Sequence, residues 1–384
     1  MDASFGVEVL MSKRIDLLRG KQIGIVSNYA TTDRHFRPTI NLLIEATEWR
    51  VTTLLAPEHG LVGCAKEGEF VESQTDAHSG LTAYSLYGKH QRPTREMLTN
   101  VDVLVIDLVD IGVRYYTNIG IAVNCLEACA ELGLPVVVLD RPNPLNGVTR
   151  EGNILSAPFV SLVGRVAIPN RHGLTLGEIL HYCNHQLRKP CNLTIVRAEG
   201  WDRDVLLPDT NLPFICSSPN TTCFDMALLY AGTCLAEGTN LSEGRGTTHP
   251  FEIIGAPYAD AHRVAEVFAQ ANLPGVVAQP VSFVPTYQKY TGELCQGVRL
   301  HVTDPNTIQP VKTGLLLIET FAKLYPDAFR FVEPQSEKGC FFDLLAGTDS
   351  LRKMVLEERS LDYFSESAQD LETFNKNIVQ FYLY

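Results

Sequence analysis

Residues 22–140 alternate between short apolar segments and longer amphipathic segments, and this alternation restricts the fold more than any other feature of the chain. Strands are expected at the β-rich apolar segments 22–28, 50–56, 101–108 and 135–140. Between them, residues 39–46 and 119–132 have the apolar spacing of helices. Continuous apolar strands separated by helices are typical of a parallel sheet that helices cover on both faces. The sequence therefore predicts an α/β fold with a mostly parallel sheet.

The rest of the chain has a looser pattern that predicts a second, smaller domain. A helix at 174–187 and a strand at 192–198 would still extend the first sheet. Further along, two strands and two long amphipathic helices are expected, at 281–287, 296–303, 311–324 and 361–381. We therefore predict a catalytic domain over residues 1–250 and an α+β domain over 251–384 that closes a cleft.

Composition excludes several classes of partner. The chain has 32 Lys and Arg against 44 Asp and Glu, a formal net charge of −12, which argues against a nucleic-acid partner. No apolar segment approaches the ~18–20 residues that a membrane-spanning helix needs, so membrane insertion is not expected. Residues 1–6 lack the features of a secretory leader. A cytoplasmic location is expected for the chain as given, and a periplasmic or secreted one if a leader was trimmed. Nothing indicates the oligomeric state.

Each of the four predicted strands in residues 22–140 ends in polar or ionisable residues. In open α/β sheets, ligands bind outside the carboxyl ends of the strands. Acidic side chains beside Arg and Tyr at this edge would suit a small polar or sugar-like ligand, although any single residue could instead cap a helix or form a turn. The residues, in strand order, are Asn28; Glu58 and His59; Asp107, Asp110, Arg114 and Tyr115; Asp140, Arg141 and Asn143.

Glu58 and a Gly-rich segment further along the chain each have a specific chemical interpretation and an alternative. Glu58 follows Pro57 at a strand-to-loop turn and could act as a general acid or base in a dry pocket, or form an ion pair with an Arg. The Gly-rich segment 237–248 contains Asn240 and Arg245 among other polar residues, and could be a ligand loop or an interdomain hinge.

The common cofactor motifs do not occur. The first strand is not followed by Gly-x-Gly-x-x-Gly, and the chain has neither a phosphate-binding loop of the Walker type nor a Gly-x-Ser-x-Gly nucleophile turn. No cofactor and no metal are therefore expected.

Several motifs occur together in an order that resembles one family, the exo-β-N-acetylmuramidases, a bacterial domain family long without an assigned function. The resemblance covers nearly the whole chain. Its motifs are LAPEHGL (55–61), YSLYGK (84–89), RPT (92–94), DLVDIGVRYYT (107–117), VLDRPNP (138–144), RHG (171–173), EGTNLSEGRGTT (237–248) and FDLLAG (342–347).

The resemblance implies a fold, an activity and a site. The fold is a Rossmann-like domain without a nucleotide, joined to a smaller domain, with the site in the cleft between them. The activity is release of N-acetylmuramic acid from the non-reducing end of peptidoglycan fragments, which makes a peptidoglycan-derived saccharide the expected partner. In the family, the Glu of the Pro-Glu-His-Gly motif is the favoured catalytic residue, which is Glu58 here. A non-catalytic protein that binds muropeptides or amino sugars is the alternative.

Most glycosidases use two carboxyl groups, and the partner of Glu58 stays open. Asp107, Asp110, Asp140 and Glu243 are candidates, and the acetamide of the substrate, oriented by Tyr115, would need no second carboxylate. Arg114, Arg141 or Arg245 could bind the lactyl carboxylate, since a guanidinium suits a carboxylate. The predicted catalytic residues are Glu58, Asp110 and Tyr115. The predicted substrate-binding residues are Asn28, His59, Asp107, Arg114, Asp140, Arg141, Asn143, His172, Asn240, Glu243 and Arg245.

Overall fold

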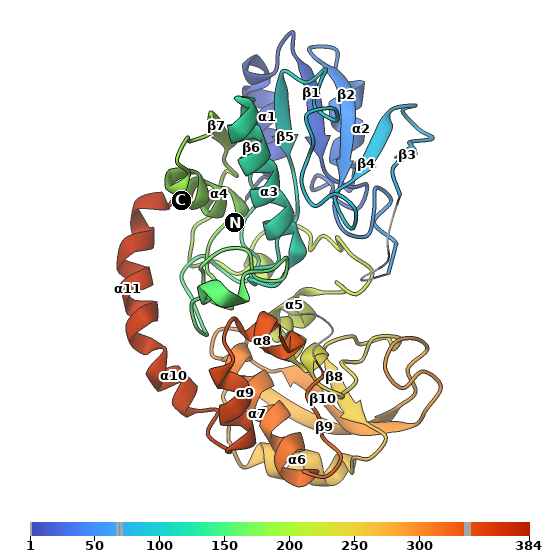
Figure 1. The fold of residues 1–384 in the computed structure, drawn as a ribbon, viewed down its shortest axis with the longest axis vertical. Helices are drawn as coiled ribbons and strands as arrows, with labels where there is room; N and C mark the ends of the chain where they lie inside the picture. The colour runs from blue at the N-terminus through green and yellow to red at the C-terminus, as the bar shows by residue number, and fades with distance from the viewer. Residues whose placement is uncertain (1, 67–68, 70–71, 334–338) are drawn as a thin grey trace.

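The computed structural model describes residues 2–66, 69, 72–333 and 339–384. It has two lobes, one built around a seven-stranded sheet and the other around a three-stranded sheet (Figure 1). The chain builds most of the first lobe, passes into the second, and finally returns along the side of the molecule to the first. No helix in these ranges is both long and apolar enough to cross a bilayer.

The large sheet has the order β3-β4-β2-β1-β5-β6-β7, and only β3 is antiparallel to its neighbour. Without β3, the order is that of doubly wound dinucleotide-binding sheets, so the predicted α/β class is confirmed. The strands are β1 Gln22–Val26, β2 Arg50–Ala56, β3 Gln74–Thr75, β4 Thr82–Ser85, β5 Val103–Ile106, β6 Val136–Leu139 and β7 Leu193–Val196.

Helices cover both faces of this sheet, which explains why its central strands β5 and β6 are apolar throughout. Val103 and Val105 of β5 belong to the core that contains α1 and α2, whereas Leu104 and Ile106 belong to the core that contains α3 and α4. Helix α3 ends at Gly133, whose φ of 70° lies in the left-handed region that favours glycine. The helices are α1 Gly6–Lys13, α2 Thr39–Glu45, α3 Thr117–Leu132 and α4 Leu176–Gln186.

The second lobe packs helices on an antiparallel sheet of order β8-β10-β9. Strand β9 begins and ends earlier than the predicted 281–287. Pro280 lies within the strand and interrupts the strand pattern in the sequence. An edge strand tolerates proline, and β9 is at the edge. The elements are α5 Phe224–Thr233, β8 Ile253–Ala256, α6 Ala261–Ala269, β9 Val276–Phe283, β10 Cys295–Val302, α7 Pro310–Leu324, α8 Phe341–Ala346 and α9 Ser350–Leu356.

The last helices of the chain run from the second lobe back to the first (Figure 1). The predicted single helix over 361–381 is divided into α10 Asp362–Glu366, α11 Ala368–Ile378 and a final 3-10 turn Val379–Phe381. Phe374, Ile378 and Phe381 are buried in the core that contains α4, and Phe381 meets the ring of Tyr182 at 5.3 Å. Residues 374–381, which the predicted boundary assigns to the smaller domain, thus complete the first lobe.

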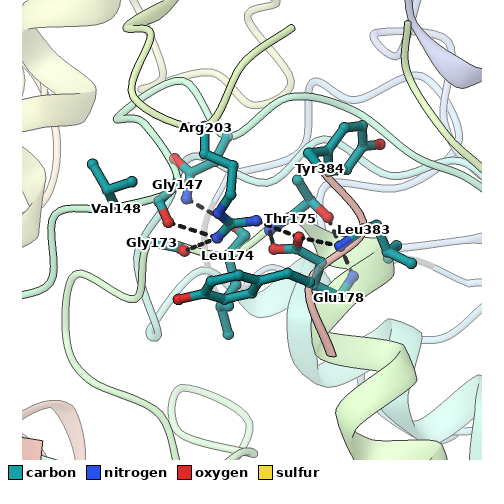
Figure 2. Close-up of polar contacts among 12 residues, drawn as sticks. Gly147, Val148, Gly173, Leu174, Thr175, Glu178, Arg203, Leu383 and Tyr384 are labelled. Carbon is teal, nitrogen blue, oxygen red and sulfur yellow. Dashed lines mark hydrogen bonds and ion pairs between the residues drawn. The ribbon is translucent and has the colours of Figure 1, made fainter. Parts of the chain in front are cut away.

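The residues after α11 are fixed by buried polar contacts (Figure 2). The backbone N–H of Leu383 donates to Glu178 Oε1 at 2.8 Å, and the same carboxylate pairs with Arg203. The Tyr384 hydroxyl donates to Asp140 Oδ2 at 2.8 Å. This C-terminal segment is therefore anchored to α4 and to the end of β6.

Buried polar contacts of Arg114 join the two lobes. Its Nη1 donates to the carbonyls of Asn153 and Ile168, at 2.7 and 2.9 Å. Its Nη2 crosses to the second lobe and donates to Leu345 and Ala346, at 3.1 and 2.7 Å. Arg114 is 1% exposed, so these bonds fix α8 against the first lobe.

Glu151 also connects the two lobes and gives a pH-dependent contribution to stability. Its Oε1 accepts the N–H of Lys312 at 2.8 Å in the first turn of α7, and burial raises its pKa from 4.5 to about 7. The folded protein therefore keeps a proton that the unfolded chain releases between pH 4.5 and 7, so this contribution is lost as pH rises. We expect Glu151→Gln to remove that loss, which melting temperatures of both proteins from pH 4.5 to 8 would show. Parallel curves would contradict the expectation.

Candidate active site

A cavity of about 740 Å³ lies between the lobes, within the range typical of ligand sites. The first lobe contributes the loop after β2, the start of α3 and the segment around residue 162, and the second lobe contributes α5 and the loops that follow it. Its lining includes Glu58, His59, Tyr87, Ile111, Tyr115, Tyr116, Thr117, Leu162, Met226, Tyr230, Glu237, Arg245, Phe251, Lys289, Phe341 and Leu345.

Glu58 is positioned by the end of β2 and the beginning of α3. Strand β2 ends at Ala56, and Pro57 stiffens the turn that brings Glu58 to the cavity wall. The Thr117 hydroxyl, on the first residue of α3, donates to Glu58 Oε2 at 2.6 Å. Glu58 is 8% exposed, and its carboxyl group lies at the N-terminal end of α3, which is the positive end of the helix dipole.

The backbone after Glu58 has an uncommon conformation. His59 has a φ of 70°, in the left-handed region where residues other than glycine are rare. Its ring Nδ1 lies 2.7 Å from the Ala65 carbonyl oxygen, which fixes the side chain at the cavity wall. Such conformations persist where surrounding contacts enforce them, and they concentrate at functional sites.

Aromatic rings form much of the remaining wall. Tyr115 and Tyr230 meet edge to face with centroids 5.9 Å apart, and Tyr230 and Phe251 do so at 4.5 Å. The Tyr115 hydroxyl donates across the lobes to the Ala231 carbonyl, and burial raises its pKa well above the usual range. Tyr115 therefore offers its ring rather than its hydroxyl to the cavity, which does not support its predicted role in orienting an acetamide.

A cluster of two acidic and two basic side chains forms the charged part of the site. Arg245 donates to Glu243 Oε1 at 2.9 Å through Nη1, and to Glu237 Oε1 at 3.1 Å through Nη2. Lys289 donates to Glu243 Oε2 at 3.0 Å and to the Leu241 carbonyl at 2.9 Å. Glu237, Arg245 and Lys289 line the cavity, and Glu243 lies behind them.

Many predicted site residues do not line this cavity, and the hydrogen bonds of several explain why. Arg141 forms a bidentate ion pair with Asp107 at 2.6 and 2.8 Å, and Thr39 donates to the same carboxylate. Asp140 accepts from Thr175 and Tyr384, and burial raises its pKa to about 6. The predicted residues away from the cavity wall are Asn28, Asp107, Asp110, Arg114, Asp140, Arg141, Asn143, His172, Asn240 and Glu243.

The other residues of this group have structural partners as well. His172 Nδ1 accepts the N–H of Leu174 at 3.1 Å, and its Nε2 lies 3.1 Å from Asp110 Oδ2. The three asparagines fix turns and loops: Asn28 accepts from Thr31, Asn143 from Leu145 and Asn240 from Arg330, at 3.0, 2.9 and 2.9 Å.

Several residues that line the cavity are not among the predicted site residues, including Tyr116, Thr117, Glu237 and Lys289. Tyr116 and Thr117 end a quoted motif, and Glu237 begins the Gly-rich segment, so position alone could have suggested them. Lys289 lies in no motif and reaches the cavity only through the fold of the loop after β9. Within the described ranges, no three His, Cys, Asp or Glu side chains gather in a way that could hold a metal ion.

Comparisons with known proteins agree with this architecture. Two family profiles match, described as the N-terminal and C-terminal parts of exo-β-N-acetylmuramidase NamZ, over residues 23–225 and 228–384. The peptidoglycan β-N-acetylmuramidase NamZ of Bacillus subtilis (strain 168) is 40% identical over 380 residues, which cover 99% of this chain and 91% of the relative.

Two crystal structures of DUF1343 family proteins from Bacteroides fragilis NCTC 9343 are also similar. The first aligns with a TM-score of 0.89 at 34% identity, and the second with 0.77 at 28% identity. Each alignment covers 100% of this chain and 99% of the other. The chain therefore belongs to the NamZ family of exo-β-N-acetylmuramidases, which are glycoside hydrolases.

Proposed function

We propose that this protein releases N-acetylmuramic acid from the non-reducing end of peptidoglycan fragments, with Glu58 as general acid and base. The observation that carries the proposal is the Glu58 carboxyl group at the wall of the interlobe cavity, bonded on one oxygen by Thr117. The identity with a peptidoglycan β-N-acetylmuramidase supports the substrate class.

The predicted carboxylate partners of Glu58 do not line the cavity, and the chemistry proposed here needs none of them. The acetamide oxygen of the substrate attacks the anomeric carbon while protonated Glu58 gives its proton to the leaving glycosidic oxygen. A water molecule then attacks the same carbon, the bond to the acetamide oxygen breaks, and Glu58 takes the proton of the water. The two steps give a product of retained configuration, and Glu58 ends protonated.

The substrate carries a lactyl carboxylate, which needs a cation in the cavity. Among the arginines considered from sequence, Arg245 lines the cavity, whereas Arg114 and Arg141 are bonded elsewhere. We assign the lactyl carboxylate to Arg245, because a guanidinium forms strong charge-assisted hydrogen bonds to a carboxylate.

Two aryl β-glycosides test the proposed activity, one of N-acetylmuramic acid and one of N-acetylglucosamine, assayed with EDTA present. We expect chromophore release from the muramic glycoside alone, because only this sugar has the carboxylate that Arg245 binds. Equal cleavage of both would refute recognition of the lactyl group. Cleavage of neither, together with tight binding of free N-acetylmuramic acid, would favour the non-catalytic binding protein.

A further inference from the structure

The charged cluster of Glu237, Glu243, Arg245 and Lys289 is neutral as a unit, although it is assigned to bind an anion. When all four groups are ionised, the two cations are balanced by the two carboxylates. Both cations contact carboxylates directly, at 2.9 to 3.1 Å. An additional carboxylate from a ligand would leave a buried net negative charge, which is unfavourable unless one group becomes neutral.

The two carboxyl groups of the cluster differ in how firmly they are fixed. Glu243 is 3% exposed, and both of its oxygens accept from cations, Oε1 from Arg245 and Oε2 from Lys289. Burial opposes ionisation of Glu243, but Lys289 and Arg245 outweigh it and lower its pKa. Glu243 therefore stays ionised and fixes the two cations in place.

Glu237 is the carboxyl group of the cluster whose protonation state can change. Its Oε1 accepts from Arg245 at 3.1 Å and from the Cys234 thiol at 3.5 Å, and its side chain is 18% exposed at the cavity. Burial raises the pKa of Glu237 against the opposing effect of Arg245. Arg245 Nη2 is bonded to Glu237, which lines the cavity, whereas Nη1 is bonded to the buried Glu243, which does not line it.

We propose that the carboxylate of the substrate replaces Glu237 on Arg245 Nη2 and that Glu237 takes up one proton as the substrate binds. Glu237 thus occupies the anion site in the free protein and leaves it as a neutral acid. The inference rests on the proposed function for the identity of the anion, and it makes recognition of the muramic sugar dependent on pH.

The other groups that face Glu237 do not account for such a proton. Burial raises the pKa values of Tyr230 on α5 and of Cys234, which directly follows α5, well above their usual ranges, so both stay neutral near pH 7. Asp343 on the adjacent helix α8 is bonded to Arg352 at 2.9 Å. The lactyl carboxyl group itself is ionised above about pH 5, as ordinary carboxyl groups are.

Calorimetry of free N-acetylmuramic acid binding to the intact protein tests the proposal without turnover. Titrations at pH 6, 7 and 8, each in two buffers of different ionisation enthalpy, give the number of protons taken up. We expect an uptake that approaches one proton per sugar above the pKa of Glu237, and none for N-acetylglucosamine, which has no carboxylate. In that range Kd should rise up to tenfold per pH unit, as a one-proton linkage requires. Binding with no proton uptake at any of the three pH values would overturn the proposal.

Glu237→Gln provides the second readout, because glutamine is neutral and cannot take up the proton. The variant should bind N-acetylmuramic acid at pH 8 more tightly than the wild type, with a Kd that no longer depends on pH. A merely structural Glu237 would instead give weaker binding at every pH, which would also refute the idea. Glu252→Gln is the matched control, since Glu252 pairs with Arg299 at 2.9 Å in the same lobe, away from the cavity. It should keep the proton uptake of the wild type. Loss of hydrolysis with intact proton-linked binding would contradict the proposed activity alone.

Discussion

Replacing Glu58 by glutamine is expected to lower kcat/KM for an aryl β-glycoside of N-acetylmuramic acid by about 10²–10⁴-fold, the usual contribution of a general acid or base. Glutamine has the size of Glu58 and can still accept the hydrogen bond of Thr117. It cannot give a proton to the leaving oxygen or take one from water. Initial rates at several substrate concentrations measure the effect, with circular dichroism as a check on folding.

The leaving group separates this chemical role from a positional one. A glycoside whose phenol is a poor leaving group depends on protonation, so it should lose more activity in Glu58→Gln than one with a strongly activated phenol. Glu45→Gln, on the exposed end of α2, serves as the control and should retain the wild-type rate. A Glu58→Gln protein with an unchanged kcat/KM would rule out the assignment.

Arg114→Ala is expected to lower the free energy of unfolding by about 4 kcal/mol or more, the range of the most damaging single substitutions. Arg114 donates to carbonyls of Asn153, Ile168, Leu345 and Ala346, in both lobes. Alanine would leave them buried without a donor, and each unsatisfied group costs roughly 1–3 kcal/mol. Urea unfolding, followed by tryptophan fluorescence and circular dichroism, measures the loss and shows whether the lobes separate first.

Arg92→Ala is the matched control for this experiment. Arg92 pairs with Glu131 at 2.7 Å, but the side chains are 45% and 66% exposed. Exposed pairs of this kind contribute roughly 0–1 kcal/mol, so the control should unfold almost as the wild type does. Equal effects of the two substitutions would mean that Arg114 does not hold the lobes together.

The centre of the sheet was predictable from sequence because its strands are buried on both faces and therefore mostly apolar, as Val103–Ile106 is. The short edge strand β3 and its neighbour β4 have no such signal, and Gln74–Thr75 is exposed. The strand predicted at 281–287 overlaps β9 but starts too late, since sequence does not show that β9 lies at an edge where Pro280 is tolerated. The interruption between α10 and α11 at Ser367 depends on how the two helices pack and not on local composition.

The site was only partly predictable, because a position at the end of a strand does not show which partner the side chain bonds. The rule placed Glu58 and His59 at the cavity, where the structure has them. It also selected Asp107 and Arg141, which form an ion pair with each other. Sequence alone does not reveal this pairing. The rule could not select Glu237 and Lys289, since they belong to the second lobe and come together only in the folded chain, where Lys289 donates to the Glu237 carbonyl.

The return of the chain to the first lobe has a consequence for synthesis on the ribosome. Phe374, Ile378 and Phe381 cover an apolar surface of α4 and its neighbours, and they follow the entire second lobe in the sequence. During translation, this surface of the first lobe therefore stays exposed until the second lobe and residues 374–381 have been synthesised. The first lobe is a natural client for chaperones during that interval, and a fragment that stops near residue 225 would remain permanently in this aggregation-prone state.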